Sequence, residues 1–207
     1  GTSSGTNMVG GLFGSSGLIM SVQISDCYST ADVSGVEYVG GLAGNAGGYM
    51  LSNIARCYST GSVTGTNRYT GGLIGYLRGA VSNCFSRSDV TGNIESGGLV
   101  GEIQNGTVSN SYSTGTVTGS SWVGGFIGFS FGTTIASFWD VTASGISTGI
   151  PAINVSGVAA RTTSEMKDIA TFTWAAWDIT AGFDKAYIWN ILGSENDGYP
   201  FFSWTKS

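Results

Sequence analysis

Several residue types are scarce or missing in this 207-residue chain, which has no histidine, only 2 prolines and only 10% charged residues. Because histidine is the most common general base and metal ligand, its absence removes much acid–base and metal chemistry. The 8 basic and 13 acidic residues give a net charge of -5, which excludes a basic surface for nucleic acid or anionic lipid. No apolar run reaches the roughly 20 residues of a membrane-spanning helix. The chain begins at Gly1 without a signal peptide or an initiator methionine, which we interpret as a cut in a longer or processed chain.

Small residues take the place of the missing types. Glycine (35), serine (29) and threonine (22) together make up 86 of the 207 residues. Collagen, flexible linkers and disordered tails have compositions of this kind. Collagen is excluded because glycine shows no three-residue period, and disorder is disfavoured because 12% of the residues are aromatic and the net charge is small. We therefore expect an ordered protein that uses glycine structurally and is long enough to bury a core.

Two sequence blocks each recur five times in the first two-thirds of the chain. Gly-Gly-Leu-x-Gly begins at Gly10, Gly40, Gly71 and Gly97, and a fifth copy at Gly124 has phenylalanine in place of leucine. The second block is Cys27-Tyr28-Ser29-Thr30, Cys57-Tyr58-Ser59-Thr60, Cys84-Phe85-Ser86-Arg87, Ser111-Tyr112-Ser113-Thr114 and Ser137-Phe138-Trp139-Asp140. Its steps of 30, 27, 27 and 26 residues indicate a repeat architecture.

Each repeat unit predicts three short strands joined by tight glycine turns, with glycines largely at fixed corners. A unit of this length cannot bury its own apolar face, but stacked units can, with strands about 4.8 Å apart. We therefore predict an all-β fold in which residues 1–145 form a parallel β-solenoid (β-helix) of about 4–5 coils. Two sets of residues should line its interior: Leu12, Leu42, Leu73, Leu99 and Phe126, and Val33, Val63, Val90 and Val117. A hairpin-based β-prism or sandwich is the alternative.

The paired blocks resemble the GLUG motif over about residues 8–145. That family occurs in large secreted and surface proteins of bacteria and some archaea, including adhesin-like proteins and some immunoglobulin-A-cleaving metallopeptidases. The resemblance implies a non-catalytic extracellular module, and it does not carry over the peptidase, whose zinc motif needs histidines that this chain lacks. The tail resembles the segment that often follows such repeats, at Phe138-Trp139-Asp140, Ser164-Glu165-Met166-Lys167, Trp177-Asp178 and Tyr199-Pro200. Phe126, Ser111 and Ser137 depart from the pattern and argue against an essential chemical role for the cysteine position.

The last third of the chain has a different composition. Only 4 of the 35 glycines lie after residue 150, whereas all three lysines and four of the six tryptophans (Trp174, Trp177, Trp189, Trp204) lie there. The capping-box sequence Thr162-Thr-Ser-Glu165 predicts a short helix that starts near residue 163. Because a solenoid must cover its last open coil, we predict that residues 146–207 form a small α+β cap with an aromatic core. An aromatic platform that stacks on sugar rings is the alternative. The N-terminal end has no comparable cap, so we expect further repeats before Gly1 or another chain over that edge.

Residues that could carry chemistry are few. Cys27, Cys57 and Cys84 share one repeat position, so we expect small buried side chains about 4.8 Å apart, with a disulfide between neighbours as the alternative. Only Asp32 and Asp89 among the carboxylates align, so we expect neither a glycosidase pair nor a calcium cluster. The carboxylates of the repeat region are Asp26, Asp32, Glu37, Asp89, Glu95, Glu102 and Asp140. Residues 195–198 (Glu-Asn-Asp-Gly) faintly resemble a calcium loop, but an ordinary turn is the simpler interpretation.

Hydroxyl side chains also recur at fixed repeat positions. They are Thr30, Thr60 and Thr114, and Ser34, Thr64, Thr91 and Thr118. Flat ranks of this kind can bind ice, but Arg87, Asp32 and Asp89 interrupt the adjacent ranks, so we expect ordinary exposed strand positions. Residues 105–107 (Asn-Gly-Thr) and 154–156 (Asn-Val-Ser) match the N-glycosylation sequon.

The sequence therefore favours a non-catalytic extracellular structural or interaction module, part of a cell-surface adhesin, stalk or fibre. The alternatives are a self-assembling extracellular filament subunit and a carbohydrate-binding module of a secreted enzyme. We expect the partner to be a protein or glycan at a cell surface, or copies of the chain end to end. No catalytic residue, cofactor or metal ligand is predicted, and no ligand-binding residue is assigned.

Overall fold

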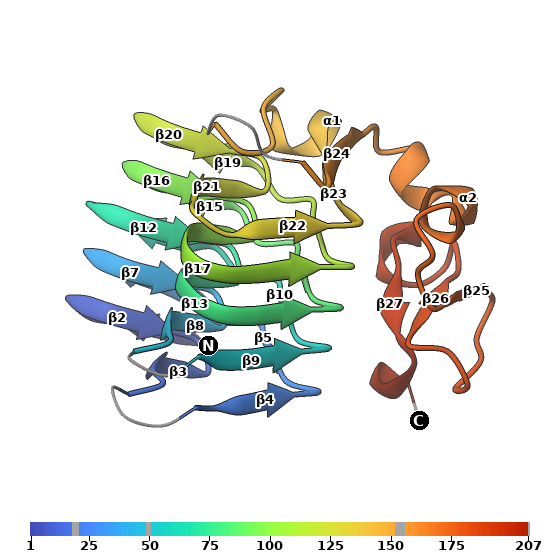
Figure 1. Cartoon of the computed structure of the whole chain (residues 1–207), viewed down its shortest axis with the longest axis horizontal. Coiled ribbons are helices and arrows are strands. Elements are labelled where there is room, and N and C mark those ends of the chain that lie inside the picture. Colours follow the sequence, from blue (N-terminus) through green and yellow to red (C-terminus); the bar gives the residue numbers. More distant parts are fainter. Residues whose placement is uncertain (18–20, 49–50, 152–155, 207) are drawn as a thin grey trace.

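The structure, a computed structural model, describes residues 1–17, 21–48, 51–151 and 156–206. Its main body is a parallel β-solenoid of five coils (Figure 1). Each coil contributes strands to four sheets, which form the sides of the stack. Short helices and one further sheet follow in the C-terminal third. The predicted fold class is thereby confirmed.

The strands of the solenoid form four sheets. The first sheet contains β1 (Thr2–Ser4), β6 (Asp32–Gly35), β11 (Val63–Gly65), β15 (Val90–Thr91) and β19 (Val117–Thr118). The second contains β2 (Asn7–Gly10), β7 (Glu37–Gly40), β12 (Arg68–Gly71), β16 (Ile94–Gly97) and β20 (Ser121–Gly124). The third contains β3 (Phe13–Ser15), β8 (Ala43–Ala46), β13 (Ile74–Ser82), β17 (Val100–Ser109) and β21 (Ile127–Ser130), joined by β4 (Gln23–Ser25), β9 (Ser52–Ala55) and β22 (Thr133–Ile135). The fourth contains β5 (Tyr28–Ser29), β10 (Tyr58–Ser59), β14 (Phe85–Ser86), β18 (Tyr112–Ser113), β23 (Ser137–Asp140) and β24 (Val158–Arg161).

The C-terminal third contains shorter elements. They are α1 (Val141–Ser144), α2 (Ile169–Thr173), the 3-10 turns η1 (Glu165–Lys167), η2 (Asn196–Gly198) and η3 (Ser203–Thr205), and a sheet of β25 (Ile179–Ala181), β26 (Trp189–Ile191) and β27 (Phe201–Phe202). The helix predicted from residue 163 is therefore present as two short pieces, η1 and α2. Its capping box also forms, because the Thr162 N–H donates to Glu165 Oε2 (2.7 Å) and the Glu165 N–H donates to Thr162 Oγ1 (3.3 Å).

Equivalent residues of successive coils lie side by side. Val63 pairs with Val33 on one side and with Val90 on the other, and every strand pair between coils is parallel. The sequence repeat is therefore the length of one coil, and the alternative of a hairpin-based prism or sandwich is wrong. A coil has four or five strands instead of the predicted three. Many of these strands have only two to four residues, too few to show an alternating pattern in sequence.

The predicted interior positions are buried, with one exception. Leu42, Leu73, Leu99 and Phe126 are fully buried, and the valine positions form a second buried cluster. Leu12, by contrast, is 48% exposed, so its predicted burial is wrong. It belongs to the first coil, and the described residues place no further coil beside it.

The glycines of the repeat serve close backbone approach more than corner conformations. A Cβ atom on Gly41 would lie 2.2 Å from the carbonyl oxygen of Gly72, and one on Gly72 would lie 2.1 Å from that of Gly98. Gly79 and Gly106 share one repeated position with positive φ, but two further columns of this kind are occupied by other residue types. They are Met8, Tyr38, Tyr69, Glu95 and Trp122 in one column, and Asp26, Arg56, Asn83, Asn110 and Ala136 in another. The sequence interpretation that glycine occupies the corners is therefore corrected.

Residues 139–151 and 156–161 cover the last coil. Trp139 occupies the position that is serine in the other four coils, and its ring packs in the solenoid core. Its Nε1 donates to the Ile146 carbonyl (3.0 Å), while the N–H groups of Gly125 and Phe126 donate to the carbonyls of Thr148 and Gly149. β24 then pairs in parallel with β23 at the edge of the fourth sheet.

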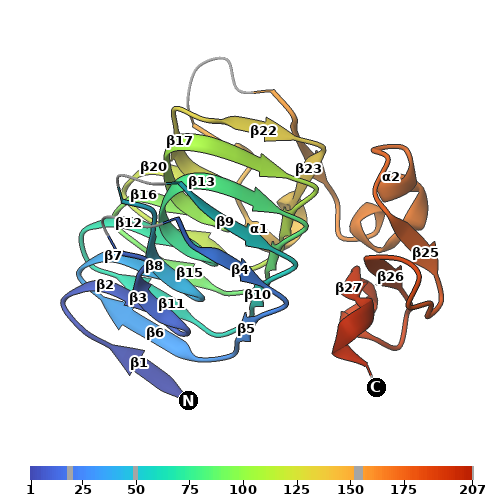
Figure 2. The same cartoon turned by 60° about the horizontal axis from the view of Figure 1, so that its bottom comes forward.

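The remaining C-terminal residues, 162–206, lie along the side of the solenoid and not over its end (Figures 1 and 2). They pack on an outward-facing column of Tyr28, Tyr58, Phe85, Tyr112 and Phe138. The first four rings stack at centroid distances of 5.1, 4.7 and 5.0 Å. The predicted placement of this segment over the last coil is therefore wrong, because the column offers apolar surface along the whole stack. The domain division at residue 145 stays a prediction.

Candidate functional site

The three cysteines occupy a structural column. All are free thiols, and the Cys57 N–H points to Cys84 Sγ (3.4 Å). Serine continues the column, since the Cys84 N–H donates to Ser111 Oγ (3.0 Å). Burial, and then the contact with Cys57, raise the pKa of the Cys84 thiol well above its usual value, which makes it a poor nucleophile. The expected small buried role of Cys57 and Cys84 is confirmed, whereas Cys27 in the first coil is only partly buried.

The aligned carboxylates tie neighbouring coils together. Asp32 Oδ1 accepts hydrogen bonds from the N–H (2.9 Å) and hydroxyl (2.8 Å) of Ser62. Asp89 Oδ1 likewise accepts hydrogen bonds from the N–H (2.9 Å) and the hydroxyl (2.7 Å) of Thr116. The alternation of acid and hydroxyl along this column therefore has a structural cause. Asp140 accepts from the N–H groups at the start of α1 and from the Tyr199 hydroxyl (2.8 Å).

Metal ligands do not gather among the residues that the structure describes, where no group of three or more Cys, Asp or Glu side chains could hold an ion. The segment 195–198, which resembles a calcium loop in sequence, leads into η2, and its Asn196 and Asp197 side chains accept from the Arg87 guanidinium. The interpretation of this segment as a turn is confirmed.

The hydroxyl ranks differ in exposure. Ser34, Thr64, Thr91 and Thr118 are exposed on the first sheet, as expected for ordinary strand positions. Thr114, by contrast, is buried. Of the two sequons, Asn105 is exposed in β17, and the one at residue 154 begins outside the described residues.

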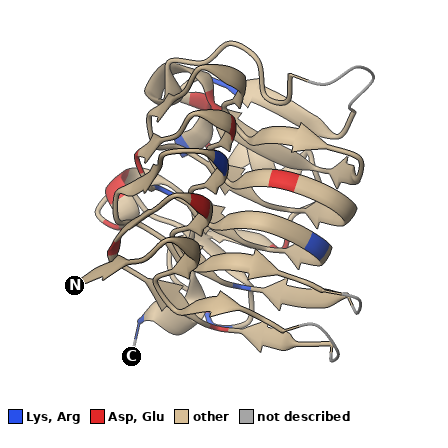
Figure 3. Cartoon of the chain, turned by 90° about the vertical axis from the view of Figure 1, so that its left-hand side faces the viewer, with Lys and Arg blue, Asp and Glu red and all other residues tan. Residues whose placement is uncertain are grey.

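A first candidate site is an aromatic strip on the face formed by the second and third sheets. Figure 3 shows the backbone from the side that lies on the left in Figure 1, with the positions of charged residues in colour. We define the strip as Tyr38, Tyr69, Tyr76, Trp122, Phe129 and Phe131. Tyr38 and Tyr69 stack at 4.8 Å, and Tyr76 meets both edge-on. Trp122, Phe129 and Phe131 form a second edge-to-face group, with centroids 5.0 Å apart at each contact. Trp122 is 45% exposed and Phe131 is 67% exposed.

Charged residues lie between the two aromatic groups. The Arg68 guanidinium donates to both oxygens of Glu95, at 3.0 and 2.6 Å. Glu102 lies in β17 between Tyr76 and Phe129 and is only 4% exposed, without an ion pair among the described residues. Burial, and secondarily the Glu95 charge, raise the pKa of Glu102 to about 7.

Sequence reasoning missed the aromatic strip, although a signal was present. Tyr38, Tyr69 and Trp122 all stand two residues before a Gly-Gly pair, and Tyr76 and Phe129 both follow a Gly-Gly-x-x-Gly block directly. Aligning the repeats residue by residue would have shown two adjacent columns rich in aromatics.

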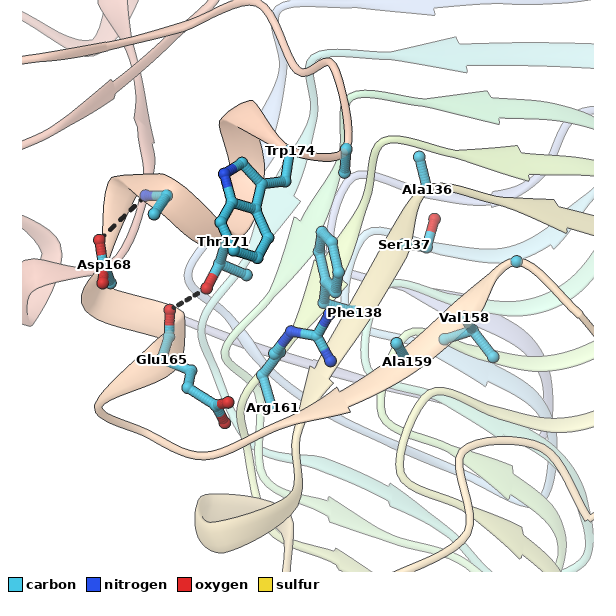
Figure 4. Close-up of a pocket in the computed structure, with 13 residues that line it drawn as sticks. Ala136, Ser137, Phe138, Val158, Ala159, Arg161, Glu165, Asp168, Thr171 and Trp174 are labelled. Atoms are coloured by element: carbon cyan, nitrogen blue, oxygen red, sulfur yellow. Dashed lines mark hydrogen bonds between the residues drawn. The ribbon is translucent and has the colours of Figure 1, made fainter.

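A second candidate site, the junction pocket, lies where the C-terminal segment meets the fourth sheet. It has a volume of about 730 Å³, and η1 and α2 form one wall while β23 and β24 form the other (Figure 4). Small residues, among them Ala136, Ala159 and Gly157, contribute to the sheet side. Polar side chains of Arg161, Glu165, Asp168 and Thr171 line it together with Trp174. Among the predicted tryptophans, Trp177 and Trp189 are buried as core, whereas Trp174 is 91% exposed.

Comparison with known proteins agrees with the fold. The sequence matches the GLUG motif at residues 35–64 and 92–118. No curated protein matches the chain in sequence. A similar solved structure is that of a "putative immunoglobulin A1 protease" from Bacteroides ovatus, with a TM-score of 0.63 and 24% identity. The match covers 88% of this chain and 57% of that protein, so this chain spans little more than half of its length. At this identity the likeness shows the fold alone.

In the part of the chain that the structure describes, no helix is long and apolar enough to cross a membrane. The family match falls on coils that stack in register, and each match ends in a strand of the first sheet, β11 or β19. These findings confirm the resemblance seen in the paired sequence blocks: the chain carries GLUG motifs at residues 35–64 and 92–118, within a β-solenoid.

Proposed function

We propose that the chain is a non-catalytic structural and interaction module of a secreted or cell-surface protein, such as an adhesin, stalk or fibre. The observation that carries this proposal is the aromatic strip, whose two groups lie on one face in the second and third coils and in the fifth coil, with Glu95 and Glu102 of the fourth coil between them. Aromatic and arginine side chains dominate the binding energy of protein interfaces. An in-register stack of coils holds these rings in place, which lowers the entropy cost of binding.

The likeness to the Bacteroides ovatus protein supports the fold and not a proteolytic role. The immunoglobulin-A-cleaving metallopeptidases that contain GLUG motifs need zinc-binding histidines, and this chain has no histidine. The whole protein's partner is proposed to be a protein or glycan at a cell surface.

The proposal is tested by measuring retention of the fluorescently labelled chain on immobilised mucins, matrix proteins and glycans. The double variant Trp122→Ser, Phe131→Ser removes the most exposed rings of the aromatic strip and should weaken retention at least tenfold. Ile135→Ser is the matched control, because Ile135 is 54% exposed but lies outside the strip. Equal retention of the double variant and the native chain would refute the role of the strip.

A second candidate is end-to-end self-association, favoured by the edge strands β1 to β5, whose outer sides have no strand partner among the described residues. Unpaired edges are templates for strand addition. Because the opposite end of the stack is covered, light scattering at rising concentration should then show dimers joined at this edge, which Leu12→Lys should abolish. Strictly monomeric behaviour at all concentrations would exclude this candidate.

A further inference from the structure

Trp174 is a large apolar side chain that the fold does not use. The other tryptophans of the C-terminal segment contact neighbouring rings: Trp177 and Trp189 lie 5.0 Å apart, and Trp204 packs on Phe202 at 5.6 Å. Trp174 is 91% exposed and has no such ring contact among the described residues. Packing of the aromatic core therefore explains three tryptophans of this segment and leaves Trp174 without a structural role.

The junction pocket next to Trp174 is large enough for a ligand. Its volume of about 730 Å³ is within the range typical of small-molecule sites. Figure 4 shows the Trp174 indole beside Thr171, with Phe138 and Arg161 toward the sheet side. One wall is thus an exposed ring, and polar side chains face the same space.

The polar groups of the pocket keep free hydrogen-bonding capacity. Arg161 uses Nη1 to donate to the Ala160 carbonyl (2.7 Å), while its Nε and Nη2 have no partner among the described residues. Glu165 uses Oε2 for Thr162, and Asp168 uses Oδ1 for the Ala170 N–H (2.9 Å), which leaves one oxygen of each carboxylate available in the described structure. The pocket therefore offers donors and acceptors beside an aromatic face.

We propose that the junction pocket binds a neutral oligosaccharide, with a sugar ring stacked on Trp174 and its hydroxyls bonded by Arg161, Glu165 and Asp168. This inference deepens the proposed function, on which it rests, by naming a ligand class and a site. A sugar has both an apolar face and many hydroxyls that donate and accept, which matches this pairing of ring and charged groups. A strongly anionic glycan fits less well, because two carboxylates and one guanidinium line the pocket and the chain has a net charge of -5.

The test uses the full chain and cello-, xylo-, malto- and chito-oligosaccharides of two to six units. Binding is measured by calorimetry and by the shift of the indole N–H signals in a ¹⁵N spectrum. The signal missing from Trp174→Ala identifies Trp174, and this signal should move most on titration. Trp174→Ala should weaken binding at least tenfold with an unchanged melting temperature, since the side chain is exposed. Arg161→Gln should weaken it severalfold.

Phe183→Ala is the matched control, because it removes another exposed aromatic side chain of the C-terminal segment, outside both the junction pocket and the aromatic strip, and should bind sugar like the native chain. No binding of any neutral oligosaccharide, or equal binding by Trp174→Ala, would overturn the inference. Binding of only sialylated or sulfated glycans, or of a peptide, would overturn it too. If retention on mucin depends on the aromatic strip but no neutral oligosaccharide binds, the junction pocket is rejected as a sugar site and the proposed function is retained.

Discussion

Glu102 is a carboxyl group whose burial should make the stability of the solenoid depend on pH. It lies in β17 between Tyr76 and Phe129, and its pKa is raised from 4.5 to about 7 by burial and then by the Glu95 charge, with Arg68 opposing. In the unfolded chain the group returns to its ordinary pKa. The folded state therefore holds this proton more tightly, and the protonated group's contribution to stability is lost as the pH rises from below 4.5 through 7.

The size of the effect follows from the shift. A difference of one pKa unit corresponds to about 1.4 kcal/mol, so the rise from 4.5 to about 7 corresponds to at most about 3.5 kcal/mol. Most of this, about 2 to 3 kcal/mol, should be lost between pH 5 and pH 9. Glu102→Gln keeps the shape of the protonated acid and cannot ionise. We therefore expect the variant to resemble the native chain at pH 5 and to be more stable at pH 9 by about 2 to 3 kcal/mol.

Urea unfolding followed by tryptophan fluorescence at pH 5, 7 and 9 measures this difference. Glu37→Gln is the control, because it removes one negative charge from the neighbouring second sheet, at a side chain that is more exposed than Glu102. A stability difference between Glu102→Gln and the native chain that does not change from pH 5 to pH 9 would refute the reasoning.

Three further predictions concern packing. Trp189→Ala should cost about 3 to 5 kcal/mol of unfolding free energy in urea, since this fully buried ring joins the C-terminal segment to the aromatic column; a loss below about 1 kcal/mol would contradict the lateral docking. Gly72→Ala should cost about 3 kcal/mol or prevent folding, because its Cβ would lie 2.1 Å from a carbonyl oxygen. Gly193→Ala is the control and should leave the melting temperature nearly unchanged, because the space at that position is open. Equal losses of stability in Gly72→Ala and Gly193→Ala would contradict the close approach of the Gly72 and Gly98 backbones. Cys84→Ser should change stability by less than about 1.5 kcal/mol, because Ser111 fills the next place in that column; circular dichroism melting would expose a larger loss.

Much of the solenoid could be predicted from the repeat. The valine and leucine positions recur at the coil length, and a parallel in-register stack places equal residues side by side, so their burial followed from spacing alone. Leu12 is the exception. Its place in the repeat predicts burial, but it lies in the first coil, and the described residues place no further coil over it. The strand count failed because strands such as β10 and β14 have only two residues.

The candidate sites were less accessible from sequence. The tryptophans of the last third were recognised as a group, but their spacing could not separate Trp177, which is core, from Trp174, which is exposed. The aromatic strip combines two columns that come from different strands of each coil. Its recognition requires knowing that the second and third sheets meet at that edge.

The amino-acid repeat was sufficient to establish the period, the parallel stacking and the buried columns, because each of these depends on a residue and its counterpart one repeat away. Contacts between distant segments, in contrast, determine that residues 162–206 pack along the side and that Trp139 and the residues after it close the last coil. Only the three-dimensional structure shows that residues such as Tyr69 and Glu95 hold repeated positions with positive φ, while glycines such as Gly72 lie where two backbones approach closely. These outcomes depend on side-chain contacts between segments up to 110 residues apart, such as Arg87 with Asp197, and no local pattern records them.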